Sequence, residues 1–200
     1  MKKLAASYTL GAFGACVLLS VAAVACAEGR RVCTPTPENV EGPYYLPDAP
    51  FRERIATPET GGSKLTLTGT VFAQDCFTPL AGAVIDVWQT DASGEYDFSN
   101  KFRLRGRARA DSKGKYRVET IVPGRYRAGR ICRPAHIHLR VSHPEGRTLV
   151  TQVYFRGDPE LGSDPFVLPA LIIPLEREKD EEGEAYLGVF DIVLQQPEGR

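Results

Sequence analysis

Two histidines spaced two residues apart, His136 and His138, stand in the most chemically varied stretch of the sequence. The stretch that begins at Tyr126 and ends at His138 also holds three arginines and a cysteine. Apolar and polar residues alternate through positions 137–141, which is typical of a β-strand. Because residues two apart in a strand point to the same face, we expect the two imidazoles to lie side by side, where they can grip one metal ion.

The donors near these histidines suit a ferric ion. Iron(III) is a hard cation that favours anionic oxygen, which phenolates supply, and imidazoles complete the set. Tyr126 lies ten residues before His136 and can fold back to the same site, and either Tyr96 or Tyr116 could supply a second phenolate. Two other interpretations compete with a ferric site. The histidines could be unrelated surface or core residues, or they could bind zinc or copper, which would leave the tyrosines without a role.

The surrounding sequence predicts an all-β fold, an antiparallel β-sandwich with few or no helices. Short β-rich stretches alternate with turns rich in Gly, Pro and Asp, as in sandwich domains. We expect a short helix only within Pro159–Leu171 and a solvated loop at Glu176–Glu184. Trp88 and Tyr116 are expected in the core, and His143 in a turn. The predicted strands are 65–72, 83–89, 116–121, 137–142, 148–155 and 187–194.

The N-terminal part of the chain differs in composition from the rest. Residues 1–27 have the features of a secretory signal peptide, with two early lysines, an apolar run and an A-x-A cleavage site. Cleavage after Ala27 would give a soluble exported protein, periplasmic or extracellular, whereas lipidation at Cys26 would give a membrane-anchored lipoprotein. Residues 28–62 are rich in proline, which predicts an extended arm before a sandwich domain at 63–200.

Charge and cysteine usage narrow the function classes. The 200 residues include 25 basic and 25 acidic side chains, so net charge implies no nucleic-acid partner. Cys33, Cys76 and Cys132 remain after the signal peptide, and export permits a disulfide that leaves one thiol over. The sequence does not fix the pairing, and we take Cys33–Cys76 as the working prediction. The spacings do not resemble a C-x-x-C zinc site.

Several sequence blocks occur in a characteristic order along the chain. In one-letter code they are LAGAVIDVWQTD from Leu80, GEY ending at Tyr96, TIVPGRY ending at Tyr126, RPAHIH ending at His138 and TQVYFRGD ending at Asp158. This series resembles the intradiol ring-cleavage dioxygenases, which include protocatechuate 3,4-dioxygenase and catechol 1,2-dioxygenase. The resemblance covers roughly residues 40–195.

The resemblance implies an oxidoreductase that uses non-haem Fe(III). Such an enzyme cleaves a catechol-type aromatic with O2 between the two hydroxyl-bearing carbons and yields a cis,cis-muconic acid, with both oxygen atoms incorporated. Catechol and O2 are thus the implied small-molecule partners, and an oligomer is possible. The implied metal ligands are Tyr96, Tyr126, His136 and His138.

The resemblance also implies roles around the metal. Tyr96 is the phenolate that substrate displaces, Arg133 stabilises negative charge on the ring, and Gln152 belongs to the active site. The alternatives are a structural salt bridge for Arg133 and a strand hydrogen bond for Gln152. The residues implied to bind substrate are Gly42, Pro43, Tyr44 and Arg133.

Some features depart from the family pattern. Val40 stands where protocatechuate-cleaving members often have threonine, which puts a hydrogen bond to a ring carboxylate in doubt. The loop from Tyr126 to Arg133 looks shorter than in those enzymes, and the chain shows no helical block of the kind catechol 1,2-dioxygenases use to dimerise. The catechol derivative and the oligomeric state therefore stay open. A non-catalytic exported binding or adhesion module is the alternative function, but such a module needs neither the H-x-H pair nor Arg133–Pro134.

Overall fold

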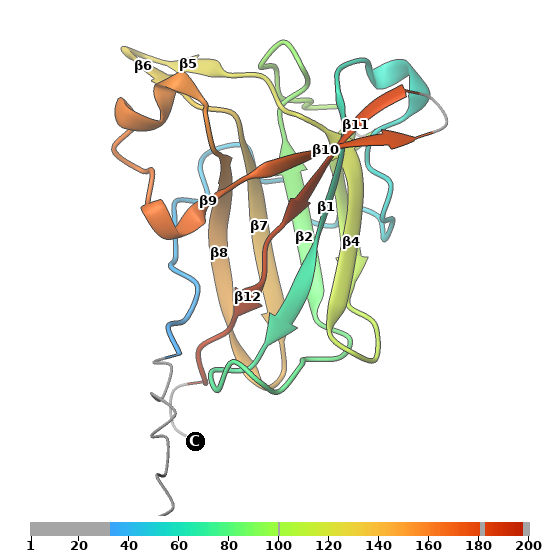
Figure 1. Cartoon of the computed structure of the whole chain (residues 1–200), viewed down its shortest axis with the longest axis vertical. Coiled ribbons are helices and arrows are strands. Elements are labelled where there is room, and N and C mark those ends of the chain that lie inside the picture. The colour runs from blue at the N-terminus through green and yellow to red at the C-terminus, as the bar shows by residue number, and fades with distance from the viewer. Residues whose placement is uncertain (1–32, 100, 181–182, 198–200) are drawn as a thin grey trace, which may run out of the picture. The chain divides into compact units, whose positions relative to one another are not determined.

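The computed structural model describes residues 33–99, 101–180 and 183–197 (Figure 1). The predicted signal peptide, residues 1–27, lies outside these ranges, as does Cys26, so both stay predictions. Within the described ranges, no helix is long and apolar enough to cross a membrane.

Short strands make up most of the regular structure, and the helices are single 3-10 turns. This confirms the prediction of an all-β chain with few helices. The strands are β1 (Lys64–Phe72), β2 (Val84–Gln89), β3 (Arg105–Arg109), β4 (Lys115–Ile121), β5 (Tyr126–Ala128), β6 (Ile131–Arg133), β7 (His136–His143), β8 (Gly146–Phe155), β9 (Ile172–Ile173), β10 (Leu175–Asp180), β11 (Gly183–Val189) and β12 (Ile192–Val193), and the helices are η1 (Pro58–Thr60), η2 (Pro159–Gly162) and η3 (Pro169–Leu171).

Two five-stranded sheets form the sandwich (Figure 1). One has the order β10-β11-β1-β12 with β4 also paired to β1, and the other has the order β3-β2-β7-β8-β9. Most pairs are antiparallel, but β1 pairs in parallel with β11 and β12, and β8 with β9. Strand β1 shows why the sheets pack, because its burial alternates with period two and turns Leu65, Leu67 and Val71 into the core.

The predicted loop at Glu176–Glu184 is wrong. Most of this run lies in β10 and β11, which pair antiparallel. The misassignment has a physical reason: β10 is the edge of its sheet, and natural edge strands carry charged side chains that prevent further pairing. The same reason hid β3, an arginine-rich edge strand. The predicted strand 187–194 is divided between β11 and β12.

The N-terminal arm closes one side of the sandwich. Here the edge strands β3 and β4 would each leave main-chain groups unpaired. The Arg52 N–H donates to the Arg107 carbonyl at 3.0 Å, and the Ile55 N–H donates to the Glu119 carbonyl at 2.9 Å. The arm therefore pairs with both sheets within a few residues.

A disulfide fixes the start of the arm. Cys33 and Cys76 are bonded, with Cα atoms 5.8 Å apart, so the predicted pairing is confirmed. Cys132 is the free cysteine among the described residues. The bridge ties the arm to the loop after β1 and closes a 43-residue separation, which restricts the unfolded chain.

Candidate metal centre

The two histidines open the central strand of one sheet. Strand β7 lies between β2 and β8, so its backbone is held on both sides. His136 and His138 are 3% and 1% exposed, and their ring centroids lie 4.9 Å apart. The spacing of two residues thus places both imidazoles on one face, in a rigid and nearly dry setting.

Two tyrosines complete a compact group of four rings. The ring centroids of Tyr126 and His136 lie 5.6 Å apart, those of Tyr96 and His138 6.3 Å apart, and those of the two tyrosines 5.5 Å apart. Tyr116, the other candidate phenol, is not in this group. Its hydroxyl donates to a main-chain carbonyl at 2.7 Å within the core, which also confirms its expected core position.

Two glycines allow the tyrosines to meet. Gly94 has φ +91°, and a Cβ there would collide with the Arg125 carbonyl beside Tyr126. A Cβ at Gly124 would in turn collide with the main chain of Gly94. The Gly124 N–H donates to the Asp91 carbonyl at 2.7 Å, which locks the two turns together. The backbones that carry the tyrosines therefore touch where only hydrogen atoms fit.

Most of the donor atoms of this group lack a hydrogen bond to the protein. Five buried side-chain polar atoms in the described residues lack a hydrogen bond, and four of them are Tyr96 Oη, His136 Nε2 and both ring nitrogens of His138. The Tyr126 hydroxyl lies near Tyr96 and shifts its pKa, but it makes no well-aligned hydrogen bond to it. The Val40 main chain has the same relation to His138. Since buried polar groups are normally satisfied, the cluster fits a bound cation.

Hydrogen bonding and burial leave the imidazoles ready to bind metal. His136 Nδ1 lies 2.6 Å from the Pro134 carbonyl, which places its proton on Nδ1 and frees the Nε2 lone pair. Burial lowers the pKa of His136 to about 4 and lowers that of His138 well below its usual value. Both rings are therefore neutral near pH 7, as metal ligands must be.

The phenols need a cation to ionise. Burial raises the pKa of both Tyr96 and Tyr126, and the Arg133 guanidinium opposes this shift at Tyr126, its hydrogen-bond partner at 3.4 Å. Without a metal, both groups stay protonated at neutral pH. A highly charged ion that favours phenolate oxygen, such as Fe(III), is the kind of ion that the set of two phenols and two imidazoles fits.

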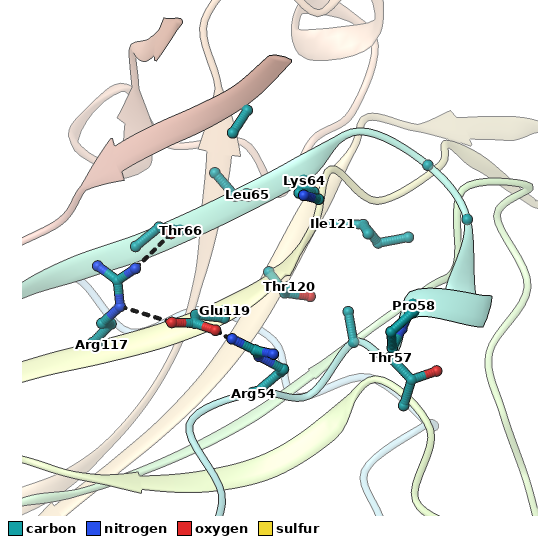
Figure 2. Close-up of a pocket in the computed structure, with 14 residues that line it drawn as sticks. Arg54, Thr57, Pro58, Lys64, Leu65, Thr66, Arg117, Glu119, Thr120 and Ile121 are labelled. Atoms are coloured by element: carbon teal, nitrogen blue, oxygen red, sulfur yellow. Dashed lines mark hydrogen bonds and ion pairs between the residues drawn. The ribbon is translucent and has the colours of Figure 1, made fainter. Parts of the chain in front are cut away.

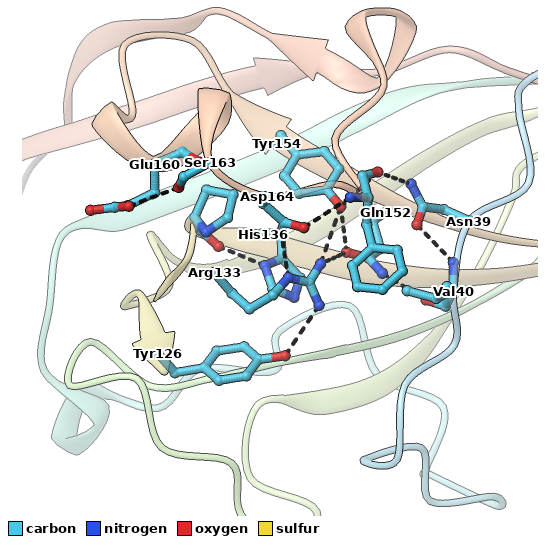
Figure 3. Close-up of polar contacts among 12 residues, drawn as sticks. Asn39, Val40, Tyr126, Arg133, His136, Gln152, Tyr154, Glu160, Ser163 and Asp164 are labelled. Atoms are coloured by element: carbon cyan, nitrogen blue, oxygen red, sulfur yellow. Dashed lines mark hydrogen bonds and ion pairs between the residues drawn. The ribbon is translucent and has the colours of Figure 1, made fainter. Parts of the chain in front are cut away.

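Arg133 is buried at the centre of a polar network (Figure 3). Its Nη2 donates to Gln152 Oε1 at 2.8 Å and to Tyr154 Oη at 3.2 Å, and its Nε donates to the Asp164 carboxylate. A structural salt bridge is thus present, and the same guanidinium also faces Tyr126. Sequence reasoning missed Asp164 and Tyr154, although Tyr154 stands two residues after Gln152 on β8.

The predicted substrate-binding segment crosses the ring cluster. The Tyr44 ring stacks on Tyr96 with centroids 4.2 Å apart, and a Cβ at Gly42 would lie 3.6 Å from the His138 ring. Pro43 is exposed between them. Gln152 Nε2 donates to the Val40 carbonyl at 2.6 Å, so the arm is also fixed to β8. Whether these residues touch substrate stays a prediction.

Trp88 and Tyr45 support the His138 ring from behind. Trp88 stacks on His138 with centroids 4.8 Å apart and planes 8° apart, which agrees with its expected place in the core. Tyr45 packs on Trp88 at 4.9 Å, and its hydroxyl donates to Asp86 at 3.0 Å. These contacts hold the imidazole plane in one orientation.

Asp158 joins the segments that carry Tyr126 and His136. Its carboxylate, 5% exposed, accepts from Arg125 Nε at 3.0 Å on both oxygens and from the Ala135 N–H at 3.0 Å. These two donors are the residues directly before Tyr126 and His136. Sequence reasoning used Asp158 only as part of a motif.

We expect Asp158→Asn to weaken iron binding about tenfold, because removing the charge loosens Arg125 and so the position of Tyr126 relative to His136. Competition with a chelator measures the affinity. Glu119→Gln is the matched control, since Glu119 accepts from Arg54 at 2.7 Å and Arg117 at 3.1 Å on the other sheet. Equal iron affinity in both variants would show that Asp158 does not position the donors.

A surface cavity lies away from the four clustered rings and from Arg133. It has a volume of about 390 Å³, and its lining includes Arg54, Lys64, Arg117 and Glu119 from the arm, β1 and β4 (Figure 2). None of the predicted metal, catalytic or substrate-binding residues lines it. Arg54 and Arg117 both pair with Glu119 there, and none of the four clustered rings contributes to this cavity.

The family assignment follows from comparison with known proteins. A family profile described as Dioxygenase matches residues 40–196. An intradiol ring-cleavage dioxygenase, prcA, from Aspergillus niger is 34% identical over 153 residues, which is 66% of this chain and 49% of that protein. Catechol 1,2-dioxygenase 2 from Acinetobacter lwoffii is 35% identical over 169 residues, or 72% of this chain and 60% of that protein. The chain thus spans about half to three fifths of these two relatives.

Solved structures of dioxygenases also match this chain. The dioxygenase domain of a dioxygenase carbohydrate-binding protein fusion from Streptomyces sp. SirexAA-E matches with a TM-score of 0.70 and 38% identity, over 82% of this chain and 100% of that one. 3-Chlorocatechol 1,2-dioxygenase from Rhodococcus opacus 1CP matches with a TM-score of 0.76 and 28% identity, over 81% and 73%. The chain belongs to the intradiol ring-cleavage dioxygenase family. These relatives do not favour the alternative of a non-catalytic module.

Proposed function

We propose that the protein is an Fe(III)-dependent, non-haem dioxygenase that cleaves a catechol-type aromatic between its two hydroxyl-bearing carbons. O2 is the second substrate, and a cis,cis-muconic acid is the product. The observation that carries this proposal is the cluster of Tyr96, Tyr126, His136 and His138, whose buried oxygen and nitrogen donors converge with so few protein partners. The names of the relatives support the same reaction class.

The donor set would hold the iron through two phenolate oxygens and two imidazole nitrogens. When bound, the ferric ion supplies Lewis acidity and a template for the two catechol oxygens. Two phenolates leave one positive charge on such a site, which suits an anionic substrate. His136 would bind through Nε2, since its Nδ1 faces the Pro134 carbonyl.

Tyr96 is the group best suited to accept a proton from substrate. Its side chain is more deeply buried than that of Tyr126, and its oxygen receives no hydrogen bond from a guanidinium. Arg133 stabilises the Tyr126 phenolate instead, from 3.4 Å. The Tyr96 phenolate is therefore the less stabilised of the two and the stronger base, so it returns more readily to the neutral phenol, with the proton on Oη.

Arg133 would stabilise negative charge that develops on the substrate. The guanidinium is 5% exposed and held by Asp164, Gln152 and Tyr154, so it need not reorganise during the reaction. A fixed cation in a water-poor site acts strongly on nearby charge. Gln152 and Tyr154 orient this cation, and the stacked ring of Tyr44 helps to exclude water from Tyr96.

Product analysis tests the proposed reaction. We expect iron-loaded protein to convert catechol to cis,cis-muconate, and mass spectrometry after reaction under ¹⁸O₂ should find both labelled atoms in the product. Cleavage between one hydroxyl-bearing carbon and its neighbour that carries no hydroxyl, which yields a semialdehyde, would contradict the intradiol assignment. Failure to consume catechol and substituted catechols with iron bound would contradict the function itself.

Export is a separate part of the proposal. The disulfide Cys33–Cys76 supports it, because such bonds persist in oxidising compartments. We propose that residues 1–27 direct the chain across a membrane. The intact mass of the exported protein distinguishes cleavage after Ala27 from lipidation at Cys26. The Cys26→Ser variant prevents lipidation and leaves cleavage after Ala27 possible. An unprocessed chain retained in the cytosol would contradict export.

A further inference from the structure

Arg105 is a buried cation that forms no ion pair with a carboxylate of the described residues. It is 1% exposed, and none of the ion pairs in the described part of the chain includes it. The other buried arginine there, Arg133, pairs with Asp164. Arginine is almost never fully buried unless it is paired, so an unpaired guanidinium at this depth calls for a reason in the surrounding site.

The sheet register places this cation on the face that carries the metal donors. Arg105 lies opposite Trp88, and Trp88 lies opposite His138, across the neighbouring strands β3, β2 and β7. Residues directly opposite one another in antiparallel strands point to the same face. The Trp88 ring stacks on the His138 ring. Arg105 is therefore two strands away from His138 in the same row of side chains.

The guanidinium bridges the arm and the segment that carries Tyr96. Its Nη1 donates to the Tyr44 carbonyl at 2.7 Å, and its Nε and Nη2 donate to the Asp97 carbonyl at 3.2 Å and 3.0 Å. Asp97 directly follows Tyr96, and the Tyr44 ring stacks on the Tyr96 ring with centroids 4.2 Å apart. One side chain therefore fixes the main chain beside both rings of this stack.

The backbone before Arg105 has an uncommon conformation. Phe102 and Leu104 have φ +51° and +52°, in the left-handed region that residues other than glycine rarely adopt. Arg52 holds this turn, because its Nη2 donates to the Phe102 carbonyl and, at 2.8 Å, to the Arg105 carbonyl. Strain of this kind persists only where the surrounding structure fixes it, and it is concentrated at functional sites. The strained turn therefore supports a functional role for the direction in which Arg105 points.

The charge of Arg105 acts on the Tyr96 ring. The guanidinium carbon lies 5.8 Å from the ring centroid, within the range of a cation–π contact. A phenolate carries a full negative charge, so a cation attracts it more strongly than it attracts the neutral ring, above all where water is excluded. The Tyr96 oxygen itself receives no hydrogen bond from Arg105, so the phenolate of Tyr126, which Arg133 contacts directly, is still the more stabilised of the two.

We propose that Arg105 is a positioning residue for the metal centre. It holds Tyr96 beside the other donors through two main-chain carbonyls, and its buried charge stabilises the Tyr96 phenolate. This inference rests on the proposed dioxygenase function and deepens it by assigning a cation to the second phenolate. Each phenolate then has a guanidinium of its own, Arg133 for Tyr126 and Arg105 for Tyr96.

The absorption spectrum of the ferric protein tests the role of this charge. Arg105→Gln keeps an amide donor for the carbonyls but removes the cation. Without the cation the phenolate gives electron density to the iron more easily, so we expect the phenolate-to-iron charge-transfer band to move to longer wavelength. Competition with a chelator should show iron binding weakened about tenfold. Arg105→Lys restores the charge and should keep the band close to its position in the unsubstituted protein.

Arg107→Gln is the matched control. Arg107 lies two residues further along β3 on the same face, donates through Nε to the Ala49 carbonyl of the arm, and stacks on the Phe51 ring at 4.4 Å from its centroid. It makes the same kinds of contact as Arg105, but with a ring that is not among the metal donors. The band and the iron affinity of this variant should equal those of the unsubstituted protein.

The outcomes separate this inference from the proposed function. An unsubstituted protein that binds no iron, or stays colourless with iron, would overturn both. A coloured unsubstituted protein together with an unchanged band in Arg105→Gln would overturn the role of Arg105 alone, as would an equal shift in Arg105→Gln and Arg105→Lys. Circular dichroism shows whether each variant folds. Arg105→Met, which buries no unpaired donor, serves if the glutamine variant does not fold.

Discussion

His138→Ala is expected to abolish iron binding, with the iron content of reconstituted protein falling from one ion per chain to under about a tenth. The substitution removes a donor whose two ring nitrogens lack a well-aligned hydrogen bond in a buried setting. Elemental analysis after reconstitution and gel filtration measures the loss, and catechol cleavage should vanish with it.

His143→Ala is the matched control for this loss. It removes an imidazole from the other end of the same strand, where Nε2 lies 3.1 Å from the Ala81 carbonyl at the surface. This variant should keep its iron. Circular dichroism and thermal unfolding show whether His138→Ala still folds despite the cavity beside Trp88. Full iron content in a folded His138→Ala variant would remove His138 from the ligand set.

Arg133→Lys is expected to lower kcat by about a hundredfold while iron content stays near that of the unsubstituted protein. Lysine keeps a positive charge beside Asp164, so the buried carboxylate retains a partner, but it cannot present the guanidinium fork to Gln152, Tyr154 and Tyr126 together. Steady-state turnover of catechol and iron analysis of the same samples separate the effect on chemistry from the effect on metal.

The control for this prediction is Arg117→Lys. Arg117 also pairs with a carboxylate, that of Glu119, but on the other sheet and with 53% of its side chain exposed. We expect its turnover to match that of the unsubstituted protein. If Arg133→Lys turns catechol over at the full rate, the guanidinium has a structural role only.

The histidine pair was accessible from the sequence because a strand has a fixed period. The i, i+2 spacing of His136 and His138 requires a shared face in any strand, so their juxtaposition needed no tertiary information. The strands with alternating apolar residues were found for the same reason. Strand β10 was missed because an edge strand buries little and its charged residues resemble a loop.

The second phenol could not be chosen from local sequence. Tyr96 and Tyr116 both follow an Asp-x-x-Gly turn, and the two turns share the same bonds from main-chain N–H groups to Asp91 and Asp111. What separates them is tertiary: Tyr116 is the second residue of β4 and is buried in the core, whereas the Gly94 turn contacts the backbone beside Tyr126.

The groups that hold Arg133 and the metal donors lie far away in the chain. Asp164 stands 31 residues after Arg133, and Asp158 stands 33 residues after Arg125. Neither spacing has a periodicity that a sequence pattern could reveal. Their contacts depend on how the segment after β8 folds back over the residues that precede β7, which the sandwich topology sets and local propensity does not.

The absorption spectrum of the ferric protein tests the central claim most directly. Coordination of Fe(III) by Tyr96 and Tyr126 predicts a phenolate-to-iron charge-transfer band, a red-brown colour that develops as one iron per chain binds, and a shift of that band when catechol is added anaerobically. A protein that binds no iron after reconstitution, or binds it and stays colourless, would contradict a metal centre built on these tyrosines.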